Sequence, residues 1–228
     1  MKKKAVVFAS TATLMFGLVA GATAAPVLEN ISAYLNWGIS FKINGQSWTA
    51  KDEDGNKLVP ITYNGSTYLP VRAVAEALGT AVDWDNDTQT VLLGEKQDTV
   101  HMNDVKIDLG YSSHVMATTD KQYTVQEGQD YKAGIVVDDI NSVQKSFKLV
   151  PEGKYQKLEL QFFGLEIQKD VEIKVYGAND TVIKHVMLSG SNSNQKVDLD
   201  IGGLKEVKVE FKSGLTAADK VFTTGTYR

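Results

Sequence analysis

Apolar and polar residues alternate with a period of two through the second half of the chain, and this pattern constrains the fold more than any other. Four segments carry it, with apolar positions at Leu158, Leu160 and Phe162; Val171, Ile173 and Val175; Val197, Leu199 and Ile201; and Val207, Val209 and Phe211. Such alternation is typical of antiparallel sheets that bury one face. With further strands expected at 100–109 and 131–137, about eight strands predict a jelly-roll-like β-sandwich for residues 100–228.

No cysteine occurs among the 228 residues. We therefore expect the fold to be stabilised by burial alone, without the disulfides common in exported proteins. The same absence excludes a cysteine nucleophile and a thiolate metal site.

The first 24 residues have the features of a secretory signal peptide. Lys2–Lys4 precede a mostly apolar run over 5–20, and Ala22-Thr23-Ala24 fits the small-x-small cleavage rule, with cleavage expected after Ala24. The alternative is an uncleaved membrane anchor, for which the apolar run is short. No second long apolar run follows, so we expect no membrane span after cleavage.

The formal net charge is −4, and loss of the three leader lysines changes it to −7. An acidic chain is a poor partner for nucleic acid or anionic lipid through bulk charge. We therefore expect no nucleic-acid partner. The predicted localisation is extracellular, with the protein either released or held non-covalently on the cell envelope.

Two Asn-Gly pairs organise the segment 39–95, which we expect to be a small β-rich α+β domain. Asn44-Gly45 and Asn64-Gly65 each separate short alternating runs, and this predicts hairpins with type I′ turns. A third hairpin is expected over 81–93, where the Asp-rich turn at 83–87 is interpreted as capping its own backbone.

One short helix is predicted between the second and third hairpins. Pro70 suits its first turn and Gly79 its end. Val71, Val74, Ala75 and Leu78 have helical spacing, so we expect this stripe to pack on the neighbouring strands.

The order of these motifs resembles the stalk domain of bacterial envelope proteins, the copper amine oxidase N-terminal-like family. The matching positions are Asn44, Gly45, Asn64, Gly65, Tyr68, Pro70, Arg72, Leu78, Gly79, Trp84, Asp85 and Thr90. The resemblance covers residues 39–95 and implies a non-catalytic spacer or interaction domain coupled to another extracellular module. It also implies that Trp84 is buried in the core.

We expect neither copper nor oxidase activity, and more generally no catalytic residue, metal or cofactor. The three histidines, His101, His114 and His185, have spacings that no single helix or hairpin would bring together. Nucleophile-elbow, P-loop and zinc motifs do not occur in the sequence. A carboxylate pair for glycoside hydrolysis stays open, as does a structural calcium ion at 52–54 or 138–139.

The second half is similar to a carbohydrate-binding module found on bacterial glycosidases. The similarity covers 108–212 and rests on the segments Tyr155–Leu158, Val171–Gly177 and Val197–Gly202. It implies sugar binding, in which exposed aromatic rings stack on the sugar. The candidate ligand-binding residues are Tyr111, Tyr131, Tyr155 and Tyr176, of which Tyr176 lies on the polar side of its strand. Packing at sheet edges is the alternative role for these tyrosines.

Together these patterns predict a secreted, non-enzymatic envelope protein that joins a spacer to a binding module for cell-wall or extracellular glycan. The alternative is a structural surface subunit that assembles with itself or with another surface protein and binds no sugar. Residues 25–38 are interpreted as a short amphipathic segment that packs on the first domain. The ligand and the oligomeric state stay open.

Overall fold

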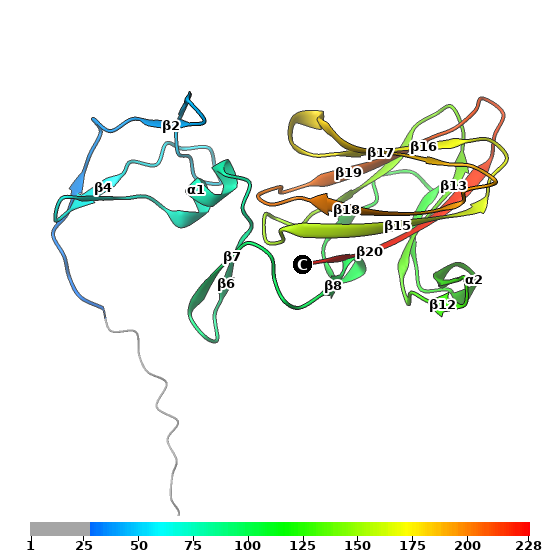
Figure 1. Cartoon of the computed structure of the whole chain (residues 1–228), viewed down its shortest axis with the longest axis horizontal. Coiled ribbons are helices and arrows are strands. Elements are labelled where there is room, and N and C mark those ends of the chain that lie inside the picture. The colour runs from blue at the N-terminus through cyan, green and yellow to red at the C-terminus, as the bar shows by residue number, and fades with distance from the viewer. Residues whose placement is uncertain (1–27) are drawn as a thin grey trace, which may run out of the picture. The chain divides into compact units, whose positions relative to one another are not determined.

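The computed structural model describes residues 28–228, so the predicted signal peptide lies outside the described residues. The chain divides into the units Met1–Ala33 and Tyr34–Arg228. The second unit is mainly β, and its paired strands are antiparallel (Figure 1). This confirms the predicted fold class. Within residues 28–228, no helix has the length and apolar character that crossing a membrane requires.

Residues 34–93 form three small sheets and one helix. The strands are β1 (Tyr34–Leu35), β4 (Ile61–Tyr63) and β5 (Ser66–Tyr68) in one sheet, and the hairpins β2 (Phe41–Ile43) with β3 (Gln46–Trp48) and β6 (Val82–Asp85) with β7 (Thr90–Leu93). Asn44, Gly45, Asn64 and Gly65 all have positive φ, as type I′ turns require. Both predicted Asn-Gly hairpins are therefore confirmed.

The helix α1 (Val71–Ala77) forms where it was predicted, directly after Pro70, but it buries only part of the predicted stripe. Ala73 and Ala75 are buried, whereas Val71 and Leu78 are exposed. The Arg72 guanidinium donates a hydrogen bond to the Val82 carbonyl at 3.1 Å. This contact turns the Arg72–Ala73 side of the helix toward β6. The predicted packing of the stripe is therefore confirmed for Ala75 and wrong for Val71 and Leu78.

The prediction that Trp84 is a core residue is also wrong. Its side chain is 45% exposed, and its indole N–H donates to Asn86 Oδ1 at 2.8 Å. The reason is that β6 pairs only with β7, so the Trp84 face of this hairpin meets no third strand. The Asp-rich turn behaves as predicted: Asp85 accepts hydrogen bonds from the backbone of Asp87 and Thr88.

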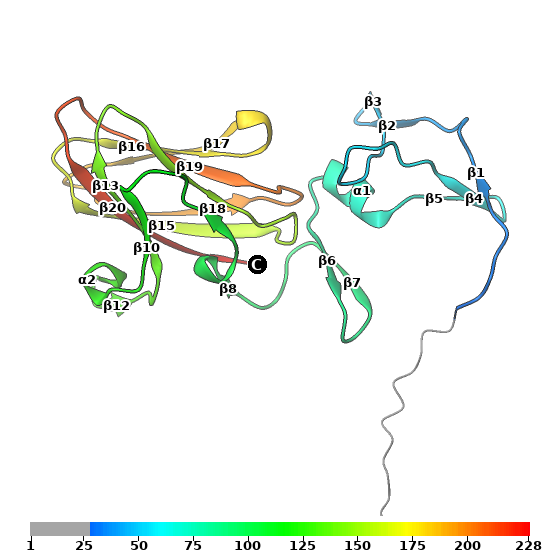
Figure 2. The same ribbon diagram turned by 180° about the vertical axis from the view of Figure 1, so that it is seen from behind.

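Residues 100–228 form a two-sheet sandwich (Figure 2). The six-stranded sheet has the order β10-β13-β20-β15-β18, with β8 also paired to β20. Its strands are β8 (Val100–His101), β10 (Val115–Thr118), β13 (Gly134–Ile140), β15 (Lys157–Glu166), β18 (Asn194–Asp200) and β20 (Asp219–Tyr227). The five-stranded sheet has the order β17-β16-β19-β14-β9. Its strands are β9 (Ile107–Asp108), β14 (Lys145–Leu149), β16 (Val171–Tyr176), β17 (Val182–Leu188) and β19 (Val207–Lys212).

The inner faces of the two sheets form the main core. The apolar positions of the alternating segments, including Leu158, Leu160 and Phe162, are buried as predicted. Phe211 of the five-stranded sheet packs on Phe162 of the six-stranded sheet, with 6.2 Å between the ring centroids. Aromatic pairs at such distances contribute about 0.5–1.5 kcal/mol beyond their burial. The core therefore spans both sheets.

The single strand expected at 100–109 is instead broken. The 3-10 turn η1 (Met102–Asp104) separates β8 from β9, and the two strands join different sheets. Met102 is fully buried at this break, and the His101 ring caps the turn by accepting the Asn103 N–H. Burial of Met102 thus diverts the chain from one sheet to the other.

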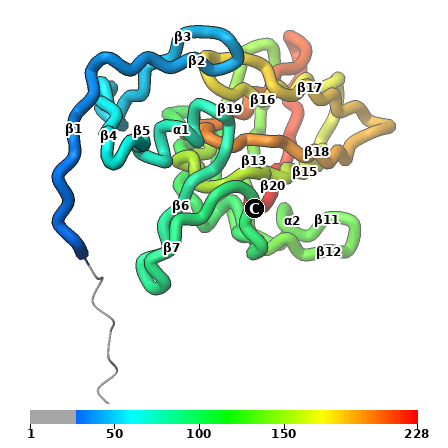
Figure 3. Tube along the Cα trace, turned by 60° about the vertical axis from the view of Figure 1, so that its left-hand side comes forward, coloured from blue at the N-terminus to red at the C-terminus, as the bar shows by residue number. Residues whose placement is uncertain are grey.

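The connection between β10 and β13 folds over the outer face of the six-stranded sheet. It contains α2 (Lys121–Thr124), β11 (Val125–Gln126) and β12 (Gln129–Asp130), which project together beside β20 in Figure 3. Under it lies a second apolar cluster, in which Tyr123 and Tyr131 pack on Val136, Phe163 and Phe222. We call this connection, residues 119–133, the covering segment.

Residues 79–82 are hydrogen-bonded to turns of the sandwich. Val82 N–H donates to Gly153 O at 2.9 Å, and Ala81 N–H donates to Gln156 Oε1 at 2.9 Å. The amide of Gln156 in turn donates to Gly79 O at 3.1 Å. Polar contacts of this kind fix the chain after α1 without merging its few buried residues with the sandwich core.

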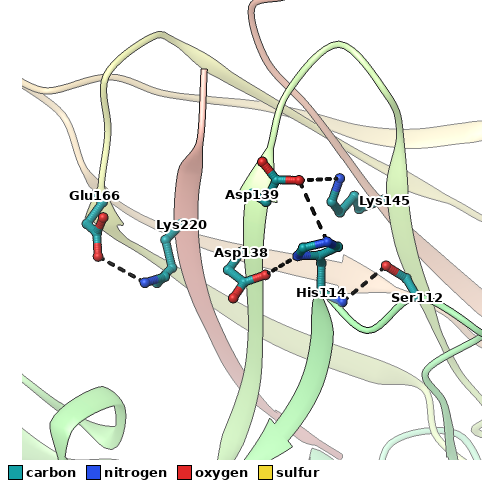
Figure 4. A network of polar contacts seen from close by, with 7 residues as sticks. All are labelled: Ser112, His114, Asp138, Asp139, Lys145, Glu166 and Lys220. Atoms are coloured by element: carbon teal, nitrogen blue, oxygen red, sulfur yellow. Dashed lines mark hydrogen bonds and ion pairs between the residues drawn. The ribbon is translucent and has the colours of Figure 1, made fainter. Parts of the chain in front are cut away.

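A polar network stabilises an irregular point of β13. The register with β20 shifts between Val137 and Ile140, and Asp139 there has φ of +48°. His114 Nδ1 lies 2.7 Å from Asp138 Oδ1, and the Lys145 ammonium lies 3.6 Å from Asp139 Oδ2 (Figure 4). The Lys145 side chain is only 7% exposed, so it depends on Asp139 for a counter-charge.

We predict unequal changes in stability when one or the other partner of this ion pair is removed. Asp139→Asn keeps a residue that tolerates positive φ but leaves the Lys145 charge unpaired, and should lower the free energy of unfolding by about 1–3 kcal/mol. Lys145→Met removes the buried charge and should change it by less than about 1 kcal/mol. Urea unfolding of both variants measures the difference, and equal losses would contradict the argument.

Candidate functional site

A shallow hollow of about 290 Å³ lies on the outer face of the six-stranded sheet. Its floor is made by Glu159 and Gln161 of β15 and by Thr226 of β20. Glu159 lies opposite Thr226 in the antiparallel register, and Gln161 lies opposite Thr224. These residues face outward because Leu158, Leu160 and Phe162, which alternate with them, are buried in the core. The floor is therefore a direct consequence of the core.

Two side chains of the floor are held by neighbours on β18. The Lys196 ammonium lies 2.7 Å from Glu159 Oε2, and this hydrogen bond raises the pKa of Lys196. Gln161 Nε2 donates to Asn194 Oδ1 at 3.4 Å. The pairing with Lys196 occupies one oxygen of Glu159, so the other oxygen can accept a hydrogen bond from a ligand.

The covering segment forms one wall of the hollow, with Tyr131 at its end. The Tyr131 ring packs on Phe163, with 5.1 Å between ring centroids, and its backbone N–H donates to Thr124 O at 2.9 Å. Phe163 lies two residues after Gln161 on β15, where the apolar cluster under the covering segment ends and the polar floor begins. Tyr131 thus lies at the boundary of the two surfaces.

Asp130 fixes the turn that carries Tyr131. Its carboxylate accepts hydrogen bonds from the Lys132 backbone N–H at 2.9 Å and from Thr124 Oγ1 at 3.1 Å, and the Lys132 ammonium lies 3.0 Å away. These contacts, the backbone bond from Lys132 first, lower the pKa of Asp130 to about 2. Asp130 is therefore an anion at neutral pH and a hydrogen-bond acceptor beside the ring.

His101 also lines the hollow, and a chain of hydrogen bonds holds its ring. Its Nδ1 accepts the Asn103 N–H at 3.2 Å, so the proton of the neutral ring is on Nε2, which lies 3.1 Å from Thr224 Oγ1. Thr224 Oγ1 in turn donates to Ala133 O at 3.1 Å. This chain ties β8 and β20 to the residue that follows the Tyr131 turn.

The structure does not bring the four candidate tyrosines together. Only Tyr131 lines the hollow. Tyr111 follows β9 and is fully exposed. Tyr155 stacks on Tyr227 at 4.7 Å, and the Lys96 ammonium lies 4.4 Å from its ring centroid. Tyr176 is half-buried, with Lys208 4.0 Å above its ring. Both rings are thus covered by other side chains.

The remaining residues of the hollow were not predicted as site residues. The alternation did place Glu159 and Gln161 on the wet face of their strand, but many other polar residues share that property. Asp130, Gln129 and His101 lie far from them in the sequence. Their proximity follows from the sheet order β13-β20-β15 and from β8 pairing with β20, which no local pattern contains.

The three histidines lie on separate elements, each with its own partner. His101 contacts Thr224, His114 contacts Asp138, and His185 Nε2 lies 2.9 Å from Glu172. Across residues 28–228, no group of three or more histidine, cysteine and acidic side chains is arranged to hold a metal ion.

Comparison with known families identifies one part of the chain. Residues 42–132 match the family described as the copper amine oxidase N-terminal domain. This confirms the resemblance seen in the sequence. The match continues past residue 95 and ends at residue 132, within the covering segment. No curated protein matches the chain.

Solved structures similar to the chain include several carbohydrate-binding modules. CBM51 from Clostridium perfringens GH95, in complex with methyl-galactose, is 14% identical, with a TM-score of 0.43, covering 57% of this chain and 100% of that one. CBM51-2 in complex with GlcNAc and INT domains from Clostridium perfringens ZmpB is 11% identical, with a TM-score of 0.44, covering 75% of this chain but only 43% of that one. CsCBM6-3 from Clostridium stercorarium, in complex with cellobiose, is 8% identical, with a TM-score of 0.33, covering 57% of this chain and 92% of that one.

The lowered pKa of Asp130 predicts how the wall of the hollow responds to acid. Because the folded-state pKa lies below the ordinary value of 3.8, Asp130 stabilises the fold above pH 3.8, and this contribution is lost as the pH falls toward 2. Asp130→Asn should therefore be less stable than the wild type at pH 6, with the gap closing near pH 2. Urea unfolding at both pH values measures it, and a constant gap would contradict the assignment.

Proposed function

We propose that the protein is an exported, non-catalytic glycan-binding protein of the bacterial cell envelope, and that the hollow on the six-stranded sheet is its binding site. In this proposal residues 39–95 act as a spacer and residues 100–228 as the binding module. One observation carries the proposal: the hollow brings Tyr131 together with carboxylate, amide and hydroxyl residues, of which Glu159, Gln161 and Asp130 are hydrogen-bonded to neighbouring residues.

This combination of groups suits a sugar ring. A pyranose presents C–H groups on its faces, which pack on an aromatic side chain, and hydroxyls at its rim, which both donate and accept hydrogen bonds. Asp130 and Glu159 offer acceptor oxygens, whereas the amides of Gln129 and Gln161 offer donors as well. A volume near 290 Å³ is at the lower end for ligand sites, which favours one sugar unit of a longer chain.

The electrostatics of the hollow support binding without hydrolysis. Glycoside hydrolysis needs a carboxylic acid whose raised pKa keeps it protonated near neutral pH. The pKa of Asp130 is lowered instead, and Glu159 is paired with the Lys196 ammonium. Asp130 is therefore suited to accept hydrogen bonds from hydroxyls and not to deliver a proton.

Replacement of Tyr131 should reduce glycan binding more than any other tyrosine replacement. We expect Tyr131→Ala to weaken binding by about tenfold or more, equivalent to about 1.4 kcal/mol, because the ring contact is lost. Gln161→Ala, which removes a floor amide without touching the core, should also weaken binding. Tyr111→Ala is the matched control, since it makes the same change on a fully exposed ring outside the hollow.

The measurement is retention on purified peptidoglycan and on a panel of insoluble polysaccharides, with displacement by free sugar and calorimetry on the best ligand. Thermal melts of each variant separate loss of binding from loss of fold. Retention by Tyr131→Ala and Gln161→Ala at the wild-type level would contradict the proposed site. Absence of retention on every polysaccharide would contradict glycan binding itself.

Export is a separate part of the proposal and rests on the leader features alone. Expression of the full gene in a bacterial host should yield protein outside the cytoplasm that begins at Ala25. N-terminal sequencing of the secreted protein tests this, with Ala22→Lys as a variant that should block cleavage because a large charged residue replaces a small one. Protein that keeps residues 1–24 and stays with the membrane would contradict it.

A further inference from the structure

The tip of the covering segment is a tight turn that contains a glutamate. Only Glu127 and Gly128 join β11 to β12 (Figure 3), and both have positive φ, +52° and +83°, as a type I′ turn requires. Asparagine and aspartate are the residues preferred at the first of these two positions, and Asn44 and Asn64 occupy it in the other Asn-Gly turns of this chain. A glutamate here makes the turn less stable, so its side chain needs another role.

The Glu127 side chain is linked to the floor of the hollow through Asn194. Asn194 Nδ2 donates to Glu127 Oε2 at 2.9 Å. Asn194 begins β18 and lies opposite Phe163 of β15, so its side chain is a diagonal neighbour of Gln161 on the outer face. Gln161 Nε2 donates to Asn194 Oδ1 at 3.4 Å. Two hydrogen bonds thus connect the tip of the covering segment with a floor amide.

The Glu127 carboxylate sets the direction of both hydrogen bonds. An ionised carboxylate accepts hydrogen bonds and donates none, so Asn194 must turn its NH₂ group toward Glu127. The Asn194 oxygen then faces Gln161, which must present its own NH₂ group to it. This leaves the carbonyl oxygen of Gln161, Oε1, for a ligand. Without the carboxylate, either atom of each amide can take either place.

We propose that Glu127 is a positioning residue of the hollow, which makes Gln161 present its carbonyl oxygen and so selects ligands that offer a hydrogen-bond donor there. This inference rests on the proposed glycan-binding function. The ligand class is a glycan whose hydroxyl is free at this point and carries no O-alkyl or O-acyl group. A free hydroxyl donates to Gln161 Oε1, whereas an ether or ester oxygen only accepts and leaves Oε1 unpaired.

Other polar groups around this amide favour the same class of ligand. The carboxylates of Glu159 and Asp130 present acceptor oxygens to the hollow. The Thr224 hydroxyl already donates to Ala133 O at 3.1 Å, so its proton is engaged. A ligand with several free hydroxyls supplies the protons that these acceptor groups need.

Three replacements of Glu127 test the direction of the two hydrogen bonds. Glu127→Gln keeps nearly the same size but both donates and accepts, so it no longer fixes the amides. Glu127→Lys only donates, so Asn194 should turn its oxygen toward residue 127, and the NH₂ group of Gln161 should then face the hollow. Glu127→Asn suits positive φ but is one methylene shorter, so it should lose the contact with Asn194.

The measurement is the ratio of the dissociation constants for one polysaccharide after and before partial O-methylation. The probes are peptidoglycan, chitin, cellulose and xylan. We expect the wild type to bind the methylated form about tenfold or more weakly, because the methylated form lacks a donor for Gln161 Oε1. The ratio should fall to about threefold or less in Glu127→Gln and below one in Glu127→Lys. The methyl groups have the same size in every measurement, so differences between variants report the direction of the amide.

Two measurements on the unliganded protein separate positioning from a structural role. Side-chain amide NMR signals of Asn194 and Gln161 should shift in Glu127→Gln, whereas the amide of Gln144, which donates to Glu210 on the other sheet, should not. Glu127→Asn should melt no lower than the wild type, because the turn gains a preferred residue, and should still lose selectivity. A purely structural contact would lose stability instead.

Each result either supports or overturns the proposal. A ratio below one in Glu127→Lys supports it, provided that Glu53→Lys, the same charge change at an exposed glutamate outside the sandwich, keeps the wild-type ratio. Equal ratios in the wild type, Glu127→Gln and Glu127→Lys, or an unshifted Gln161 signal, would overturn the role of Glu127 while glycan binding stands. Absence of wild-type binding to every probe would overturn the proposed function, and the ligand selection by Glu127 with it.

Discussion

Contact between the inner faces of the two sheets is the interaction on which the rest of the structure depends. The chain has no cysteine, so burial of side chains such as Phe147, Phe162 and Phe211 takes the place of crosslinks. Because side chains alternate along a strand, burial of one set fixes the other set on the outer faces. Glu159 and Gln161 form the floor of the hollow for this reason. Packing of the core beneath them fixes their positions.

The same alternation explains how far the sequence could predict the site. It predicted correctly that Leu158 and Leu160 face inward, and hence that Glu159 faces water. It could not predict that Tyr131 lies beside Gln161, because that neighbourhood depends on the order of β13, β20 and β15 in the sheet. Strand order is set by the packing of the whole domain. The tyrosines predicted from the sequence therefore include one residue of the hollow, Tyr131, but the polar residues that line it were not predicted.

The wrong predictions in residues 34–93 have a different physical cause. The spacing of Val71 and Leu78 and the family resemblance of Trp84 both identified side chains that are more stable when covered. Such a pattern does not specify which surface covers them. Arg72 turns α1 toward β6, the β6–β7 hairpin has no third strand, and Val71, Leu78 and Trp84 remain exposed. The pattern therefore identified which side chains are apolar, but not which of them the fold buries.

The outer faces of the two sheets of the sandwich differ in the side chains that they present. On the five-stranded sheet, charged side chains pair with one another, as in Lys174 with Glu172 and Lys148 with Glu206. The hollow beside Lys148 is lined mainly by charged and small residues, without an aromatic ring. The hollow that contains Tyr131 is on the other sheet, and all its residues lie between His101 and Thr226, outside the segment 34–93.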